Sequence, residues 1–215
     1  MSTEDPSIVH NYSWADEFFS EARLAGYLDD AKGSYSLALD AYTQDLRALC
    51  EITAWINVLE VSLRSAMTKK LDATLSLGTG EWFQNIDVLL ISTGKDALSI
   101  ARKRVSRSGA KLTGASITAA LSLGFWVNLL ARNYETSLWT PALHKAFPNL
   151  RRPNRQLVHS KLSEICRLRN HVAHQGLITV VELGACRDQI LEVLDWMSPE
   201  GHTWARANVP SLISW

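Results

Sequence analysis

The segment from Ser36 to Leu75 constrains the fold more than any other part of the chain, because it predicts one long helix that Gly78 and Gly80 end. Its apolar residues recur at spacings of three and four, which is typical of an amphipathic helix. They are Leu46, Leu49, Ile52, Ile56, Leu59, Leu63, Met67 and Leu71. A helix of this length favours a helical bundle in which it is the central element.

The rest of the chain also has helical periodicity, and strand signals are scarce. The sequence therefore predicts an all-α fold, a helical bundle with a long central helix. Further helices are expected over residues 13–31, 87–106, 116–133, 155–174 and 180–197, with a short helix and loop over 138–153 and ordered coil from 200 onward. We expect an N-terminal helical segment over 1–33 packed on the bundle, a main domain over 34–204 and a C-terminal tail over 205–215.

Composition excludes several classes of protein. The chain has 215 residues, of which 47% are apolar, so it can bury the core of one domain. Its first twenty residues are acidic and polar, unlike a signal peptide, and no apolar stretch is long enough to span a bilayer. The three cysteines show no pairing pattern, which fits reduced thiols and a cytoplasmic location. The zinc, P-loop and dinucleotide motifs are absent, so we expect no metal and no cofactor.

The formal charge is zero in total but unevenly distributed. Residues 1–100 carry a net charge of −8, residues 101–155 a net charge of +9, and residues 156–215 a net charge of −1. The basic segment predicts either a surface for a polyanion such as RNA or a face that neutralises the acidic segment. The RNA-binding candidates are Arg102, Lys103, Arg104, Arg151, Arg152 and Arg155.

Two charged residues fall inside apolar helix faces. On a helical wheel Arg169 lies between Ile165 and Leu162, and Glu60 lies among the apolar residues of the long helix, with Arg64 at the edge. A charge on an apolar face is costly unless it is paired. We therefore expect Glu60 and Arg169 to meet across a helix interface, either as a functional pair or as a structural ion pair.

The run RLRNHVAHQGLI begins at Arg167 and contains the spacing R-x-x-x-x-H, formed by Arg169 and His174. Asn170 directly follows the arginine. The run and four further blocks, LEVSLRSAM, LSLGFWVNLL, LWTPALHKAFP and LDWMSPE, resemble in order those of Abi-like (abortive infection) proteins of the HEPN superfamily. The resemblance covers residues from about 34 to 204.

The resemblance implies a HEPN-type helical fold, a homodimer and a metal-independent endoribonuclease. It assigns Arg169, His174 and Asn170 to catalysis, with Glu60 and Arg64 in support. It also implies a growth-arresting effector in phage defence or in a toxin–antitoxin system, with RNA as substrate and an antitoxin that is a protein or an RNA. The rival interpretation is a non-catalytic helical module that binds RNA or a protein partner.

The spacing of the motif also favours a dimer. Residues five apart lie about 140° apart on an ideal helix, so Arg169 and His174 of one straight helix diverge. They converge if the helix frays at His174, if Arg169 reaches round, or if two chains build one site. Two chains would supply two histidines, one as acid and one as base.

Overall fold

A computed structural model describes residues 12–76, 81–173 and 180–212. Its central element is α3, Tyr35–Leu75, a helix of 41 residues. At 1.5 Å per residue the helix is about 60 Å long. The side chain of Ser34 caps its first turn by accepting a hydrogen bond from the Leu37 amide. The predicted all-α fold with a long central helix is confirmed, and no strand occurs in these three described ranges.

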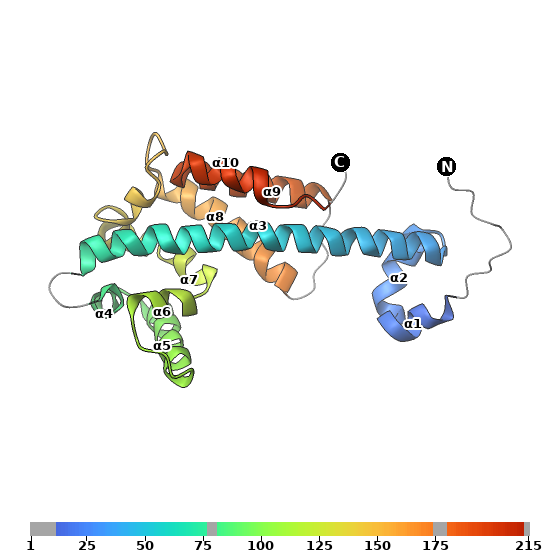
Figure 1. The fold of residues 1–215 in the computed structure, drawn as a ribbon, viewed down its shortest axis with the longest axis horizontal. Coiled ribbons are helices and arrows are strands. Elements are labelled where there is room, and N and C mark those ends of the chain that lie inside the picture. Colours follow the sequence, from blue (N-terminus) through green and yellow to red (C-terminus); the bar gives the residue numbers. More distant parts are fainter. Residues whose placement is uncertain (1–11, 77–80, 174–179, 213–215) are drawn as a thin grey trace.

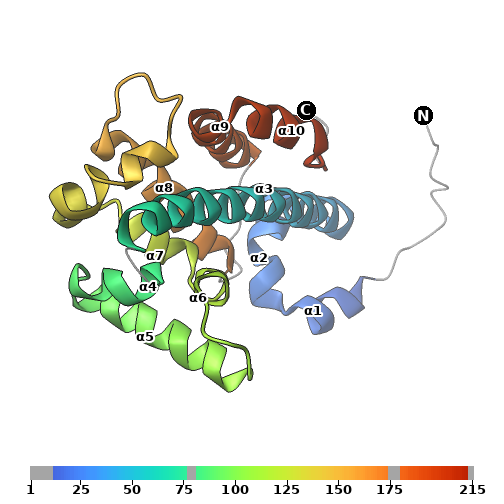
Figure 2. The ribbon, with the colours of Figure 1, turned by 60° about the vertical axis from the view of Figure 1, so that its left-hand side comes forward.

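The other elements are arranged around α3 on different sides (Figure 1). Helices α1 (Ser13–Phe19) and α2 (Glu21–Asp30) lie below the N-terminal end of α3. Helices α4 (Trp82–Asn85), α5 (Ser92–Arg107) and α6 (Gly114–Ala120) lie below its C-terminal end, whereas α9 (Val180–Met197) and α10 (Pro199–Asn208) lie above it. Figure 2 shows the same separation from a second direction.

The remaining elements are α7 (Leu123–Asn128), α8 (Arg155–Ala173) and four short pieces. The short pieces are the 3-10 helices η1 (Ile86–Val88), η2 (Arg132–Tyr134) and η4 (Leu143–Ala146), and the π-helix η3 (Glu135–Trp139). None of the helices in the described ranges is long and apolar enough to cross a membrane.

The core follows the apolar stripe of α3. Its buried residues are Ala38, Ala48, Glu51, Ile52, Trp55, Ile56, Leu59, Leu63, Met67 and Leu71. The predicted stripe is therefore buried from Ile52 onward. Leu46 is exposed and Leu49 is half-buried, because the N-terminal part of α3 is covered mainly by α2 and not by the bundle.

Two of the predicted helices are broken in the structure. The helix expected over residues 13–31 divides at Ser20, whose φ of 69° interrupts the helical geometry. The helix expected over 116–133 divides at Leu121 and Ser122, which are extended. The residues 121, 123, 125–127, 129 and 130 are all buried. A straight helix with one face in the core could not bury all of them, which explains the break.

The predicted coil from residue 200 onward is wrong, because α10 occupies Pro199–Asn208. The side chain of Ser198 accepts a hydrogen bond from the Gly201 amide, and Pro199 occupies the first turn. This combination starts a helix. From the sequence, Pro199 predicts only the end of the preceding helix. The predicted helix over 87–106 also begins later, at Ser92, after the short elements α4 and η1.

A buried carboxylate lies on α3, at Glu51, which is 0% exposed. Its Oε2 atom accepts a hydrogen bond of 2.8 Å from the Leu212 amide, so the C-terminal segment lies against α3. Within the described part of the chain, its Oε1 atom has no hydrogen-bond partner. The helical wheel predicts a carboxylate on the apolar face at Glu60 and does not single out Glu51.

The packing of α9 predicts how two of the three cysteines differ in reactivity. Cys50 is exposed, whereas Cys186 of α9 is buried, and burial raises the pKa of the Cys186 thiol to about 12. Because the thiolate is the reactive form, a thiol reagent at pH 8 should modify Cys186 at least about tenfold more slowly than Cys50. Mass-spectrometric labelling of the native protein measures both rates. The variant Cys50→Ser should lose the fast phase, and rapid labelling of Cys186 would contradict the described packing of α9.

Candidate functional site

The described part of the motif lies at the C-terminal end of α8. Arg169 is half-buried and Asn170 is exposed. An Nη1 group of Arg169 donates a hydrogen bond of 3.4 Å to the Asn170 side-chain oxygen. His174, the third catalytic candidate, lies outside the described residues. The structure therefore gives the geometry of the arginine and the asparagine alone.

Arg169 and Glu60 line one small cavity between α3 and α8, which we call the motif cavity. It has a volume of about 240 Å³ and is lined by Thr53, Ile56, Asn57, Glu60, Arg169 and Val172. Glu60 and Arg169, which the sequence predicts to meet across a helix interface, therefore line one cavity between α3 and α8. Both side chains are half-buried, and among the described residues no ion pair within 4.0 Å joins them.

The electrostatic effect of this pair is seen at Cys166, which lies one turn before Arg169 on α8. Burial raises the pKa of the Cys166 thiol, the charge of Arg169 lowers it, and the charge of Glu60 raises it. The two charges thus act on the same point from opposite directions. Arg64 lies one turn beyond Glu60 on α3, is half-buried, and does not line the motif cavity.

A larger groove adjoins the motif cavity, and we call it the aromatic groove. Its volume is about 840 Å³, and it shares Thr53 and Val172 with the motif cavity. The aromatic residues that line it are Phe18, Phe19 and Tyr42. Phe18 is 76% exposed, and the guanidinium of Arg23 lies 5.5 Å from the centre of the Tyr42 ring. The aromatic groove extends from α1 and α2 to the motif end of α8.

The predicted RNA-binding residues of α5 differ in whether their side chains have hydrogen-bond or ion-pair partners within the protein. Arg102 forms an ion pair of 2.9 Å with Asp87 and donates a hydrogen bond of 2.9 Å to the Phe83 carbonyl. Arg104 donates to the Ala120 carbonyl over 3.3 Å. Lys103 is exposed and has no partner in the described part of the chain. Arg102 therefore has a structural role, because it ties α5 to the preceding elements.

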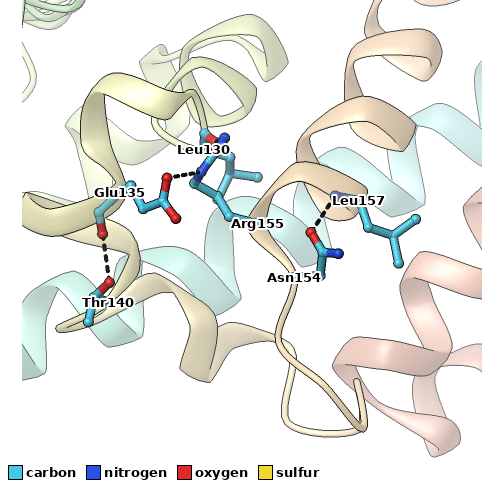
Figure 3. Close-up of polar contacts among 6 residues, drawn as sticks. All are labelled: Leu130, Glu135, Thr140, Asn154, Arg155 and Leu157. Atoms are coloured by element: carbon cyan, nitrogen blue, oxygen red, sulfur yellow. Dashed lines mark hydrogen bonds and ion pairs between the residues drawn. The ribbon is translucent and has the colours of Figure 1, made fainter.

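The second basic group lies before and at the start of α8 (Figure 3). The Arg155 side chain is 11% exposed, donates a hydrogen bond of 2.9 Å to the Leu130 carbonyl and pairs with Glu135. Asn154 caps the helix by accepting from the Leu157 amide. Arg151 and Arg152 are exposed and have no ion pair among the described residues. Arg155 thus holds α8 to the η2–η3 segment.

The two basic groups do not form one surface. In Figures 1 and 2, α5 lies below α3, whereas the segment that joins η4 to α8, which carries Arg151 and Arg152, lies above it. A polyanion that contacts one group would have to pass around α3 to reach the other. Both groups lie in the basic segment over residues 101–155, and the sequence alone does not indicate that they are separated in space.

A third cavity lies at the start of α8, and we call it the α8-start cavity. It has a volume of about 690 Å³, and its lining includes Arg132, Arg152 and His159. Burial, followed by the charge of Arg155, lowers the pKa of His159. Neither Arg132 nor His159 is among the predicted site residues, because neither belongs to the R-x-x-x-x-H motif or to the two predicted RNA-binding clusters. The sequence feature that could have indicated this cavity is the density of basic residues over positions 132–159.

Comparison with known proteins found no relative of the chain. No protein-family model, no curated protein and no solved structure matches the chain. The resemblance to the Abi-like proteins therefore rests on the sequence blocks quoted above. Within the described ranges no group of three or more His, Cys, Asp or Glu side chains could hold a metal ion.

The contacts of Arg155 predict a stability difference within one pair of arginines. Arg155→Ala leaves the Leu130 carbonyl without this donor, and hydrogen bonds to charged groups contribute about 1.5–3 kcal/mol. For a chain of this size the loss should lower the Tm by several degrees, at about 2–4 °C per kcal/mol. Arg152→Ala removes an exposed side chain and should change the Tm little. Thermal unfolding followed by circular dichroism measures both, and equal Tm values would contradict a structural role for Arg155.

Proposed function

We propose that this protein is a metal-independent endoribonuclease whose site is built around Arg169 at the motif end of α8. The observation that carries the proposal is that Arg169 and Glu60, from different helices, line one cavity. The sequence blocks that resemble the Abi-like HEPN proteins support it independently. Asn170 is next to the arginine and exposed, where a substrate can reach it.

The chemistry follows from the residue types. The 2′-hydroxyl of the RNA attacks the adjacent phosphorus, the bond from phosphorus to the 5′-oxygen breaks, and the leaving oxygen takes a proton. One His174 takes the proton of the 2′-hydroxyl, and a second His174, from the other chain of a dimer, gives a proton to the leaving 5′-oxygen, because an imidazole titrates near neutral pH. The planar guanidinium of Arg169 binds the phosphate oxygens as negative charge develops on them. Asn170 orients the phosphate or the histidine. The products are a 2′,3′-cyclic phosphate and a 5′-hydroxyl.

Glu60 has a positioning role in this scheme. It lies in the motif cavity with Arg169, and without a contact ion pair the guanidinium keeps donors free for phosphate. A carboxylate nearby favours one orientation of the arginine. Arg64 and the exposed basic residues Lys103, Arg151 and Arg152 contribute positive potential for RNA.

The biological role that we propose is a growth-arresting effector in phage defence or in a toxin–antitoxin system. An antitoxin, either a protein or an RNA, would hold such an enzyme inactive until a trigger releases it. A cytoplasmic location fits an RNA substrate and the reduced cysteines. A second candidate function is a non-catalytic module of the same fold that binds RNA or a protein. The exposed Phe18 in the aromatic groove favours this alternative.

Cleavage of RNA by substituted proteins tests the proposal. His174→Ala should lower the cleavage rate by roughly 10²–10⁴-fold, as the loss of an acid or base does. Arg169→Ala should also lower it, with only a small change in Tm, because Arg169 is half-buried and lacks a contact ion pair. A chelator should leave the rate unchanged, and mass spectrometry of the products should find cyclic phosphate ends.

The matched control for these variants is Arg206→Ala, an exposed arginine on α10, a helix that carries none of the proposed site residues, and this variant should keep full activity. A fully active His174→Ala protein would reject the nuclease and favour the binding module.

We also propose a homodimer with the C-terminal part of α8 at the seam. Arg167 and Asn170 are exposed there, and a second chain would supply a second histidine. Arg167→Glu places a negative charge at this seam, so it should shift the protein toward the 24.0 kDa monomer and reduce cleavage. Arg107→Glu on α5 is the control. Analytical ultracentrifugation measures the masses, and an active monomer at all concentrations would exclude this seam.

A further inference from the structure

The α8-start cavity gathers positive charge from three parts of the chain. Arg132 comes from η2, Arg152 from the loop before α8, and Arg155 and His159 from α8 itself. Glu135 of η3 also lines the cavity, but it is paired with Arg155. The two charges of that pair compensate each other, which leaves the cavity with a net positive charge.

Arg132 and Arg152 are available for a ligand. Both are exposed, and neither has an ion pair or a side-chain hydrogen bond in the part of the chain that the structure describes. Their neighbour Arg155 contrasts with them, because its guanidinium is committed to Leu130 and Glu135. Planar guanidinium groups that converge on a cavity suit the oxygen atoms of a phosphate.

His159 adds a titratable donor to the same cavity. It is half-buried, and its ring has no hydrogen-bond partner among the described residues. The charged groups that line the cavity with it are Arg132, Arg152, Arg155 and Glu135. Burial and Arg155 lower the pKa of His159, so the ring is mainly neutral at pH 7 when the cavity holds no anion. A bound dianion would favour the imidazolium and so would raise the pKa again.

The cavity also lies where α8 begins. Asn154 caps the helix, and a helix of 19 residues carries partial positive charge at this end. This contribution adds to the side chains and would not define a site without them.

We propose that the α8-start cavity binds a phosphate group of a nucleotide or of RNA, through Arg132, Arg152 and His159. The cavity is separate from the motif cavity, because Arg155 and Arg169 lie about 21 Å apart along α8 at 1.5 Å per residue. The proposal does not depend on RNA cleavage. If the protein is the nuclease proposed above, the cavity holds a phosphate remote from the bond that is cut.

Binding measurements with two adjacent arginines test the inference. Arg151 and Arg152 are both exposed, but only Arg152 lines the cavity. The probes are inorganic phosphate, AMP, and a 2′-O-methyl RNA hexamer made with a 5′-phosphate or a 5′-hydroxyl, which the proposed reaction cannot cleave. At constant ionic strength, Arg152→Gln and Arg132→Gln should each weaken binding of the tightest probe about tenfold, as loss of a charge-assisted contact does. Arg151→Gln should change the binding of inorganic phosphate and AMP less than about twofold, because Arg151 does not line the cavity. For the RNA hexamers, to whose binding Arg151 also contributes positive potential, the control is Arg206→Gln on α10.

The titration of His159, followed by proton NMR, provides a second readout. Its pKa should rise when the probe binds, and this rise should be lost in Arg152→Gln. Tighter binding of AMP and of the 5′-phosphorylated hexamer would identify a terminal phosphate as the ligand. Equal binding of the two hexamers, together with no binding of AMP, would identify an internal phosphodiester. Equal effects of Arg151→Gln and Arg152→Gln on phosphate or AMP binding, or an unchanged His159 titration with every probe, would overturn the proposal. All variants keep Arg169, Asn170 and His174, so this result and the cleavage result are independent.

Discussion

The structure depends on the burial of one apolar stripe along α3. A single helix of 41 residues in water leaves its apolar face exposed, and packing against other elements supplies most of its stability. Helices α7, α8 and α9 and the segment η4 all pack against this helix. The geometry of the motif cavity follows from this arrangement, because α3 brings Glu60 and α8 brings Arg169 to one interface. A change in the packing of α8 on α3 would therefore alter both the core and the proposed site.

Long regular segments were predictable from the sequence, whereas breaks were not. The helices α3, α8 and α9 agree closely with their predicted ranges because their apolar residues keep one period over many turns. The break at Leu121 arises because nearly every side of that segment is buried, a property that only the assembled bundle reveals. A helical wheel also could not locate the buried carboxylate, Glu51. Glu51 lies under the C-terminal segment, a contact between residues that are distant in sequence.

The sequence also predicted part of the site, because the periodicity of a helix shows which residues share a face. A helical wheel places Arg169 and Glu60 on apolar helix faces, but it gives no distance between the two side chains. It therefore could not show that the two side chains form no ion pair within 4.0 Å. Composition counted ten basic residues in one segment and could not separate those that hold the fold from those that face solvent. Arg102 and Arg155 each donate to a backbone carbonyl, which only tertiary structure supplies. Of the predicted RNA-binding residues, Lys103, Arg151 and Arg152 are the ones that are exposed and have no hydrogen bond or ion pair among the described residues.

The contact between Glu51 and Leu212 has a consequence for how the protein is made. The carboxylate and the amide that donates to it are separated by 161 positions in the chain. A ribosome adds roughly 5–20 residues per second, so Glu51 waits on the order of ten seconds or more for this partner to be synthesised. A buried carboxylate is costly without a hydrogen bond, so during that interval this part of α3 should remain hydrated. Closure of the α3–C-terminal contact is then a late event in co-translational folding, after the helices of the bundle have left the ribosome.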